Sequence, residues 1–280
     1  MRYDQIVSDE IEQHSVSPID MLGIGDMTSE YTYLKSHQDS YIRTVRDVDA
    51  LFNNDASSRH VLEIGSFLGT VSISLKKIGY AVSSCDIPEF YSSPSLRNLY
   101  ESNGIHFNGL NLKHAKLPYE SNSFDIVIMC EVLEHLNFNP LPVISEISRV
   151  LKSDGYIYIG MPNQSNIGNR LKLALGRSIH NPIEEYFKQL NRNINMVVGL
   201  HWREYTLPET LQMIRKMGFN PVKKYYYIEK AVAEKNLLTA MKMMAKKILY
   251  LYPPFRPSQV VIGKKDKVPV FDFWLTEANS

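Results

Sequence analysis

The run Val61-Leu62-Glu63-Ile64-Gly65-Ser66-Phe67-Leu68-Gly69-Thr70 decides the fold of this chain. Its first four residues are a short, mainly apolar run ending at a glycine, which is typical of a buried parallel strand that enters a tight turn. Residues 69–78 then carry apolar side chains at helical spacing, so a helix follows the turn directly. A strand, a glycine turn and a helix N-terminus together let a ligand approach the backbone closely.

The same alternation of strand and helix continues from this turn to Pro162. Strands are predicted at 61–64, 80–87, 105–112, 124–130 and 156–161, and helices at 69–78, 94–102 and 140–151. Alternation at this spacing implies right-handed crossovers and a parallel sheet with helices on both faces. Two later strands, at 222–228 and 259–263, bring the expected number to seven. The predicted fold class is therefore α/β and Rossmann-like, with a mostly parallel sheet.

The chain divides into parts by pattern. Residues 1–38 are weakly patterned and predict an N-terminal helix and loop extension, and residues 266–280 predict a C-terminal tail. Residues 39–265 predict the core, which opens with an amphipathic helix near 40–53. Inside the core, the polar stretch 163–200 is too long for an ordinary loop, so we expect a helical insert that caps the site after the fifth strand.

Two further helices are predicted beyond the insert. Thr206 stands three residues before Glu209, the spacing of a capping box, and predicts a helix that runs to Lys216. An apolar, Lys-bearing stretch at 231–252 predicts another helix. Its lysines allow peripheral contact with a membrane surface, although a helix packed on the core with its lysines in solvent is favoured.

Composition narrows the partners and the compartment. Thirty-one Lys and Arg against 30 Asp and Glu give a net charge of +1, which provides no field for an extended nucleic-acid partner. Cys85 and Cys130 lie in strand-like runs and are expected to be reduced. No signal peptide and no run of 18 apolar residues are found, so we expect a cytoplasmic protein. The oligomeric state is not indicated.

The glycine turn differs from a dinucleotide-binding turn. Phe67 occupies the place of the middle glycine in G-x-G-x-x-G, which disfavours a pyrophosphate and a nicotinamide dehydrogenase. Glu63 at the strand end also suits a ligand ammonium group better than a phosphate. Asp86 ends the second strand, 21 residues beyond Gly65, where a carboxylate can accept both hydroxyls of a ribose.

Later motifs carry a specific resemblance. Residues 117–127 (LPYESNSFDIV), 131–136 (EVLEHL) and 150–163 (VLKSDGYIYIGMPN) follow the glycine turn in order. Over about residues 55–265 the chain resembles class I methyltransferases. The resemblance implies the class I methyltransferase fold, S-adenosyl-L-methionine as cofactor and S-adenosyl-L-homocysteine as product.

The resemblance also implies roles for individual positions. Glu63 and Gly65 would face the methionine part of the cofactor, and Asp86 the ribose. The full set of implied cofactor-binding residues is Glu63, Gly65, Ser66, Phe67, Gly69, Asp86, Ile87, Asn111, Leu112, Cys130 and Glu131. The family often carries an acidic residue near Asn111 and Leu112, in the adenine loop, and this chain does not.

The segment 199–206 (GLHWREYT) resembles a His-x-Arg-Glu-(Tyr/Phe)-Thr run in methyltransferases of surface-polysaccharide and lipid-linked sugar clusters. His201 can remove a hydroxyl proton during methyl transfer, or it can pin the cap through hydrogen bonds. Glu131 and His135 are the other candidate catalytic residues. The hypothesis is O-methylation, by direct SN2 transfer, of a hydroxyl on a glycan, a lipid-linked saccharide or another small-molecule acceptor.

Two other functions stay open. Glu131, Glu134 and His135 have the spacing of the divalent-metal motif of small-RNA 2′-O-methyltransferases, which would indicate metal-assisted methylation of RNA ends. Metal-free relatives carry the same run, and the near-zero net charge disfavours RNA, so no metal is expected. Phe67 in the glycine loop is the one hint of a catalytically silent binding scaffold.

Overall fold

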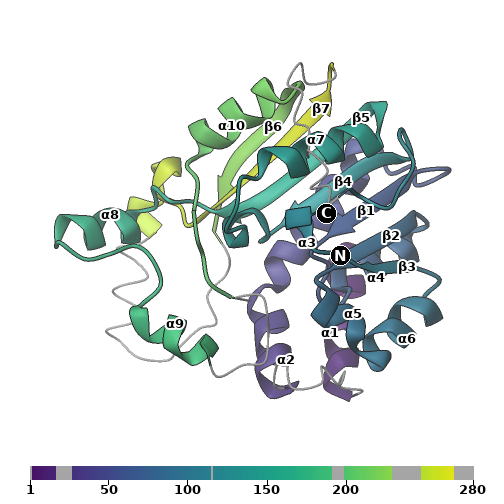
Figure 1. Ribbon diagram of the computed structural model, residues 1–280, viewed down its shortest axis with the longest axis horizontal. Coiled ribbons are helices and arrows are strands. Elements are labelled where there is room, and N and C mark those ends of the chain that lie inside the picture. The colour runs from purple at the N-terminus through teal and green to yellow at the C-terminus, as the bar shows by residue number, and fades with distance from the viewer. Residues whose placement is uncertain (1, 17–26, 115, 191–198, 229–246, 268–280) are drawn as a thin grey trace, which may run out of the picture.

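The computed structural model describes residues 2–16, 27–114, 116–190, 199–228 and 247–267. A seven-stranded sheet with the order β3-β2-β1-β4-β5-β7-β6 forms its centre (Figure 1). The strands are β1 (His60–Ile64), β2 (Ala81–Asp86), β3 (His106–Gly109), β4 (Phe124–Cys130), β5 (Leu151–Pro162), β6 (Phe219–Tyr227) and β7 (Ser258–Lys265). Only β7 runs antiparallel to its two neighbours. The predicted α/β fold with a mostly parallel sheet of seven strands is confirmed.

Helices cover both faces of the sheet. The described helices are α1 (Arg2–Val16), α2 (Met27–Ser36), α3 (Gln38–Leu51), α4 (Thr70–Ile78), α5 (Pro88–Ser92), α6 (Pro94–Ser102), α7 (Leu141–Val150), α8 (Ile167–Ala174), α9 (Ile183–Leu190) and α10 (Leu207–Lys216). Successive strand residues point to opposite faces, so Ile126 and Ile128 join the core under α1, α3 and α4. Val127 and Met129 join the core under α7 and α10.

The N-terminal segment is more helical than expected. Where a helix and a loop were predicted over residues 1–38, α1 and α2 form two helices. Val7 and Ile11 lie one helical turn apart on α1 and are fully buried against α3 and α4. The Tyr3 hydroxyl donates to the Asp49 carboxylate at 2.7 Å, which ties the start of the chain to α3.

Two strands begin three or more residues earlier than predicted. Leu151 already pairs with Phe124, although the sequence pattern places it at the end of a helix, and a register shift follows at once. β6 starts at Phe219, three residues ahead of its predicted start, because Phe219, Asn220 and Pro221 already pair with β7 ahead of a register shift at Val222. Most of the predicted helix at 231–252 lies outside the described residues, as does the tail beyond 267.

The capping box is present as predicted. The Glu209 carboxylate accepts from the Thr206 backbone N–H at 2.8 Å, and the Glu209 N–H donates to the Thr206 hydroxyl at 3.4 Å. Within the part of the chain that the structure describes, no helix has the length and apolar character needed to cross a membrane.

Candidate functional site

The glycine turn after β1 takes a left-handed path. Gly65 and Gly69 have φ values of 76° and 78°, and Phe67 adopts a φ of 46° despite its side chain. The Asp86 carboxylate accepts hydrogen bonds from the backbone N–H groups of Phe67 at 2.6 Å and Ile87 at 2.7 Å. These charge-assisted bonds offset the strain of a non-glycine residue at Phe67. The loop is therefore held in shape by Asp86 instead of by a central glycine.

Aromatic packing fixes the same loop from outside. The Tyr100 hydroxyl donates to Ser66 Oγ at 2.7 Å and to the Phe67 carbonyl at 3.1 Å. The Phe67 ring lies 5.5 Å from the Phe90 ring and 5.7 Å from the Tyr33 ring, measured between centroids. Phe67 is thus partly buried against the core beside α2 and α5, which explains how a large side chain is accommodated at this turn.

Two buried carboxyls lie beside this turn. Glu63 is directed to the helix after the turn, where it accepts a hydrogen bond from Ser72 of α4, and Ser72 also contacts Ser84 at 2.6 Å. Burial raises the pKa of the Glu63 carboxyl to about 8. Burial likewise raises the pKa of the Asp86 carboxyl to about 6, although its backbone donors oppose the shift. Among the described residues no salt bridge neutralises either group, so a cationic or hydroxyl-bearing ligand would stabilise both.

The adenine-loop candidates lie next to Asp86. β2 pairs with β3, and the Leu110 N–H donates to the Asp86 carbonyl at 2.7 Å. Asn111 and Leu112 follow at once, and the Asn111 side chain accepts from the Lys113 N–H at 3.0 Å. Strand pairing thus brings the predicted residues of β1, β2 and β3 to one edge of the sheet, as the ends of parallel strands require.

Cys130 ends β4 at the same edge, and Glu131 follows it. Glu131 has a φ of 52°, and its N–H donates to the Gly160 carbonyl at 2.9 Å. Burial raises the pKa of the Cys130 thiol, so this cysteine stays protonated at neutral pH. Val132 then passes directly over the glycine turn, because a Cβ built on Gly65 would lie 2.2 Å from Val132 Cγ2. The chain after β4 therefore closes over the turn after β1.

His201 is held directly by two residues, Asn181 of the insert and Glu204 of the segment that returns from it. Its N–H donates to Asn181 Oδ1 at 2.9 Å, and its ring Nδ1 lies 3.0 Å from Glu204 Oε1. The second oxygen of Glu204 accepts from the Asn169 amide of α8 at 3.1 Å. The hydrogen bond to Glu204, together with the charge of Glu134, raises the pKa of His201. His201 therefore both pins the cap and carries a more basic imidazole than usual.

His135 and Glu134 lie against His201. The His135 and His201 ring centroids are 4.9 Å apart, and His135 Nδ1 lies 2.9 Å from the Leu200 carbonyl oxygen. The Glu134 side chain is fully buried, and neither carboxylate oxygen has a hydrogen-bond partner. Among the described residues, the group that can hold a metal is Glu134, His135 and His201. This group contains His201 and not Glu131, so it differs from the metal alternative of Glu131, Glu134 and His135 that the sequence spacing predicts.

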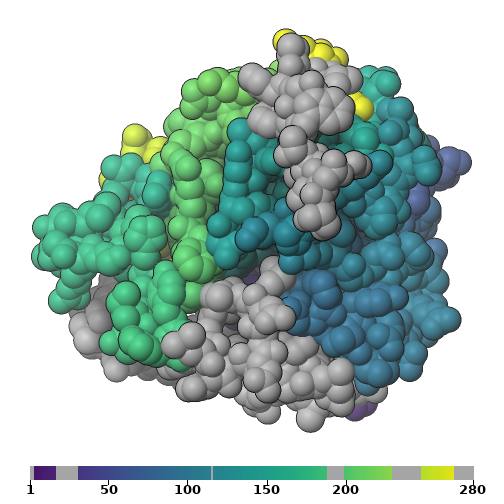
Figure 2. All heavy atoms as spheres, viewed as in Figure 1, coloured from purple at the N-terminus to yellow at the C-terminus, as the bar shows by residue number. Residues whose placement is uncertain are grey.

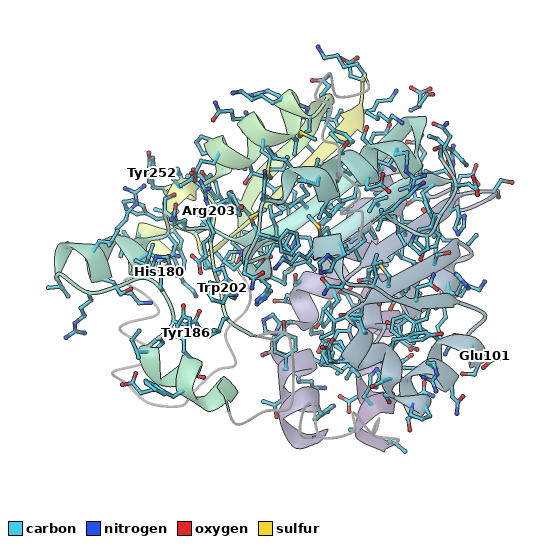
Figure 3. The ribbon with its side chains drawn as sticks, viewed as in Figure 1. Glu101, His180, Tyr186, Trp202, Arg203 and Tyr252 are labelled. Atoms are coloured by element: carbon cyan, nitrogen blue, oxygen red, sulfur yellow. The ribbon has the colours of Figure 1, made fainter. Side chains whose placement is uncertain are left out.

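The insert projects from the sheet as α8 and α9 (Figures 1 and 2). The Asn166 side chain caps α8 by accepting from the Asn169 N–H at 3.0 Å. Figure 3 shows Tyr186 of α9 directed towards Trp202, with ring centroids 5.8 Å apart. A small hollow between the insert and its return is lined by Gln164, Ile179, His180, His201 and Glu204.

Comparisons with known proteins agree with this geometry. Residues 62–159 match a family model described as a methyltransferase domain. This stretch is therefore similar to a methyltransferase domain, and it holds β2 to β4 and most of β1 and β5 of the seven-stranded sheet. An uncharacterized protein of Methanocaldococcus jannaschii is 37% identical over 57 residues, which are 20% of this chain and 24% of that protein.

Solved structures show the same fold at low identity. A SAM-dependent methyltransferase of Thermotoga maritima, a possible histamine N-methyltransferase, has a TM-score of 0.53 at 17% identity, covering 85% of this chain and 96% of its own. One from Archaeoglobus fulgidus has a TM-score of 0.52 at 16% identity, with 84% and 100% covered. Phosphoethanolamine N-methyltransferase 2 of Haemonchus contortus, in complex with S-adenosyl-L-methionine, has a TM-score of 0.53 at 15% identity, with 80% and 53% covered.

Three contacts around His201 were missed from the sequence, those made by Glu204, Asn169 and Asn181. Glu204 lies three residues after His201, and this spacing was the only sign of their pairing. Asn169 and Asn181 lie in the insert, where many polar residues look alike. The assignment of individual residues to the cofactor stays a prediction, although Glu63, Asp86 and the turn at Gly65 have the chemistry that it needs.

Proposed function

We propose that this chain transfers a methyl group to a hydroxyl oxygen of a glycan, a lipid-linked saccharide or another small hydroxylated metabolite. S-adenosyl-L-methionine supplies the electrophilic methyl group when it is bound along Glu63, the Gly65 turn and Asp86. The observation that carries the proposal is the pair formed by His201 and Glu204, at 3.0 Å, next to His135 in the turn that follows β4. An alkyl hydroxyl must lose its proton as it is methylated, so a positioned imidazole suits oxygen as the acceptor atom.

The tautomer of His201 supports this role. The Glu204 carboxylate only accepts hydrogen bonds, so Nδ1 carries the hydrogen and a neutral ring keeps its lone pair on Nε2. A C–O bond forms as the S–methyl bond breaks, the sulfur keeps the electron pair, and the hydroxyl proton goes to Nε2. Alignment of the reactants provides most of the acceleration, and a base of this kind adds about 10²–10⁴-fold.

The setting of His201 supports a polar acceptor. The small hollow beside it is lined by the Gln164 amide and the His180 imidazole, next to the Glu204 carboxylate that already pairs with His201. Such groups pair with hydroxyls and cost free energy when they are left unpaired. The free thiols of Cys85 and Cys130 support the reducing cytoplasm as the location of the protein.

The first test is calorimetric titration of S-adenosyl-L-methionine and S-adenosyl-L-homocysteine into the wild type and Asp86→Ala. Binding by the wild type that is much weaker in the variant supports the cofactor site. No binding by the wild type would instead favour a catalytically silent scaffold.

The second test follows methyl transfer from labelled cofactor to polyhydroxylated sugars and, in parallel, to primary amines. Transfer to a sugar that falls at least about 100-fold in His201→Asn supports the proposal. Transfer to amines alone would place this chain with methyltransferases that act on nitrogen, and it would overturn the oxygen assignment.

A further inference from the structure

Three electron-rich groups converge where the 3-10 turn Leu133–His135 meets the segment that returns from the insert. Glu134, His135 and His201 each offer one ligand atom, and these atoms all lie within 4.8 Å of one another. The two segments are held together by backbone, because the Trp202 and Arg203 N–H groups donate to the Glu134 carbonyl at 2.8 and 3.2 Å. The convergence is therefore built by the fold and does not depend on chance side-chain positions.

Hydrogen bonds determine which ring nitrogen of His135 and of His201 carries no hydrogen. The Leu200 carbonyl oxygen, 2.9 Å from His135 Nδ1, can only accept, so that nitrogen carries the hydrogen. The Glu204 carboxylate imposes the same tautomer on His201 from 3.0 Å. Each neutral ring consequently keeps a lone pair on Nε2. Fixing the tautomer through the second ring nitrogen is what proteins do to histidines that bind metals.

The Glu134 carboxylate of this cluster has no hydrogen-bond partner. Its side chain is fully buried and both of its oxygens lack a hydrogen-bond partner. A buried carboxylate is ordinarily paired with a cation or coordinated to a metal, because an unpaired charge away from water is costly. Among the residues that the structure describes, no Lys or Arg pairs with Glu134. Two imidazoles and one buried carboxylate thus lie together, and no Lys or Arg of the described residues neutralises the carboxylate.

We propose that Glu134, His135 and His201 bind one divalent transition-metal ion. Two imidazoles and one carboxylate favour a first-row transition-metal ion, from Mn²⁺ to Zn²⁺ in the series, over Mg²⁺ or Ca²⁺, which prefer oxygen ligands alone. Bonds of about 2.1 Å place neighbouring ligand atoms roughly 3–4 Å apart, so small side-chain rotations close the observed spacing. The Leu200 carbonyl and Glu204 act as the outer shell that orients the rings.

An ion with three protein ligands keeps positions open for other oxygens. If the proposed function holds, two adjacent hydroxyls of a sugar acceptor would fill these positions. The substrate class would then be a vicinal diol. A proton and an ion compete for Nε2 of His201. In the metal-loaded protein, polarisation of the bound hydroxyl therefore replaces the base role of His201.

The test is titration of Mn²⁺ and, separately, Zn²⁺ into untagged, chelator-stripped protein, followed by calorimetry and by the electron paramagnetic resonance of Mn²⁺. We expect one ion per chain in the wild type and a rise in melting temperature on loading. Glu204→Gln, which removes an outer-shell contact, should weaken binding about 10- to 100-fold. Glu134→Gln and His135→Asn should weaken it further.

His180→Ala is the matched control, because His180 lines the hollow beside His201 but lies outside the cluster. Binding of S-adenosyl-L-homocysteine checks that each variant is folded, and His135→Asn serves if Glu134→Gln is not. A wild type that binds S-adenosyl-L-homocysteine but no ion overturns this proposal and leaves the methyl-transfer function standing. Equal losses in His180→Ala and His135→Asn also overturn it. A protein that binds the ion but methylates no hydroxyl overturns the proposed function and leaves the ion site.

Discussion

Replacing Gly65 by alanine should disturb the cofactor turn in two separable ways. The residue has a φ of 76°, and a left-handed conformation costs an L-residue about 1–2 kcal/mol. The new Cβ would also lie 2.2 Å from Val132 Cγ2, far inside van der Waals contact. Overpacking of that kind costs about 1–3 kcal/mol. We expect Gly65→Ala to lower the free energy of unfolding by about 2–5 kcal/mol in total.

Two controls separate these contributions. Gly176 has a φ of 67° and nothing within 4 Å of a built Cβ, so Gly176→Ala should lose only the backbone contribution. Val132→Ala removes the methyl group that the new Cβ would meet. The double variant Gly65→Ala/Val132→Ala should therefore lose about 1–3 kcal/mol less free energy of unfolding than the two single variants lose together. Urea denaturation of the four variants and the wild type measures both effects. If Gly65→Ala is as mild as Gly176→Ala, or if the cycle shows no coupling, the close contact between Val132 and the turn is wrong.

Three further predictions concern the carboxyls and His201. Burial raises the pKa of Glu63 from 4.5 to about 8, so the folded protein binds this proton more tightly than the unfolded chain does. The free energy of unfolding should therefore fall as the pH rises between these values. Urea denaturation at several pH values should show a smaller fall for Glu63→Gln. Asp86→Ala should weaken binding of S-adenosyl-L-homocysteine about 10- to 150-fold, the loss of one charged hydrogen-bonding group, whereas Glu120→Ala on the surface should leave calorimetric affinity unchanged. Since Glu204 raises the pKa of His201 above 6.5, and a base must be neutral, kcat/KM in metal-free protein should rise with pH through a midpoint above that value. Glu204→Gln should move this midpoint to lower pH, and an unmoved midpoint would assign the titration to another group.

The sheet could be predicted from local sequence patterns because the spacing of apolar residues follows the burial of each strand. The apolar run at 124–130 and the turn at Gly65 each specify a buried strand and its end without help from distant residues. The predicted boundaries failed at Leu151 and Phe219, where pairing with a neighbouring strand extends β5 and β6. That pairing is a tertiary interaction, so no window of neighbouring residues contains it.

Part of the candidate site could likewise be predicted from local sequence, and part depends on tertiary contacts. The sequence by itself determined the α/β class, the seven strands and the presence of Glu63, Asp86 and Glu131 at strand ends, because strand ends follow from periodicity and parallel strands share an edge. Only the tertiary structure decided that Asp86 holds Phe67 in place and that His201 meets Glu134 and His135 instead of Glu131. Those contacts join segments far apart in the chain, and their geometry depends on how the insert returns to the sheet, which local spacing does not encode.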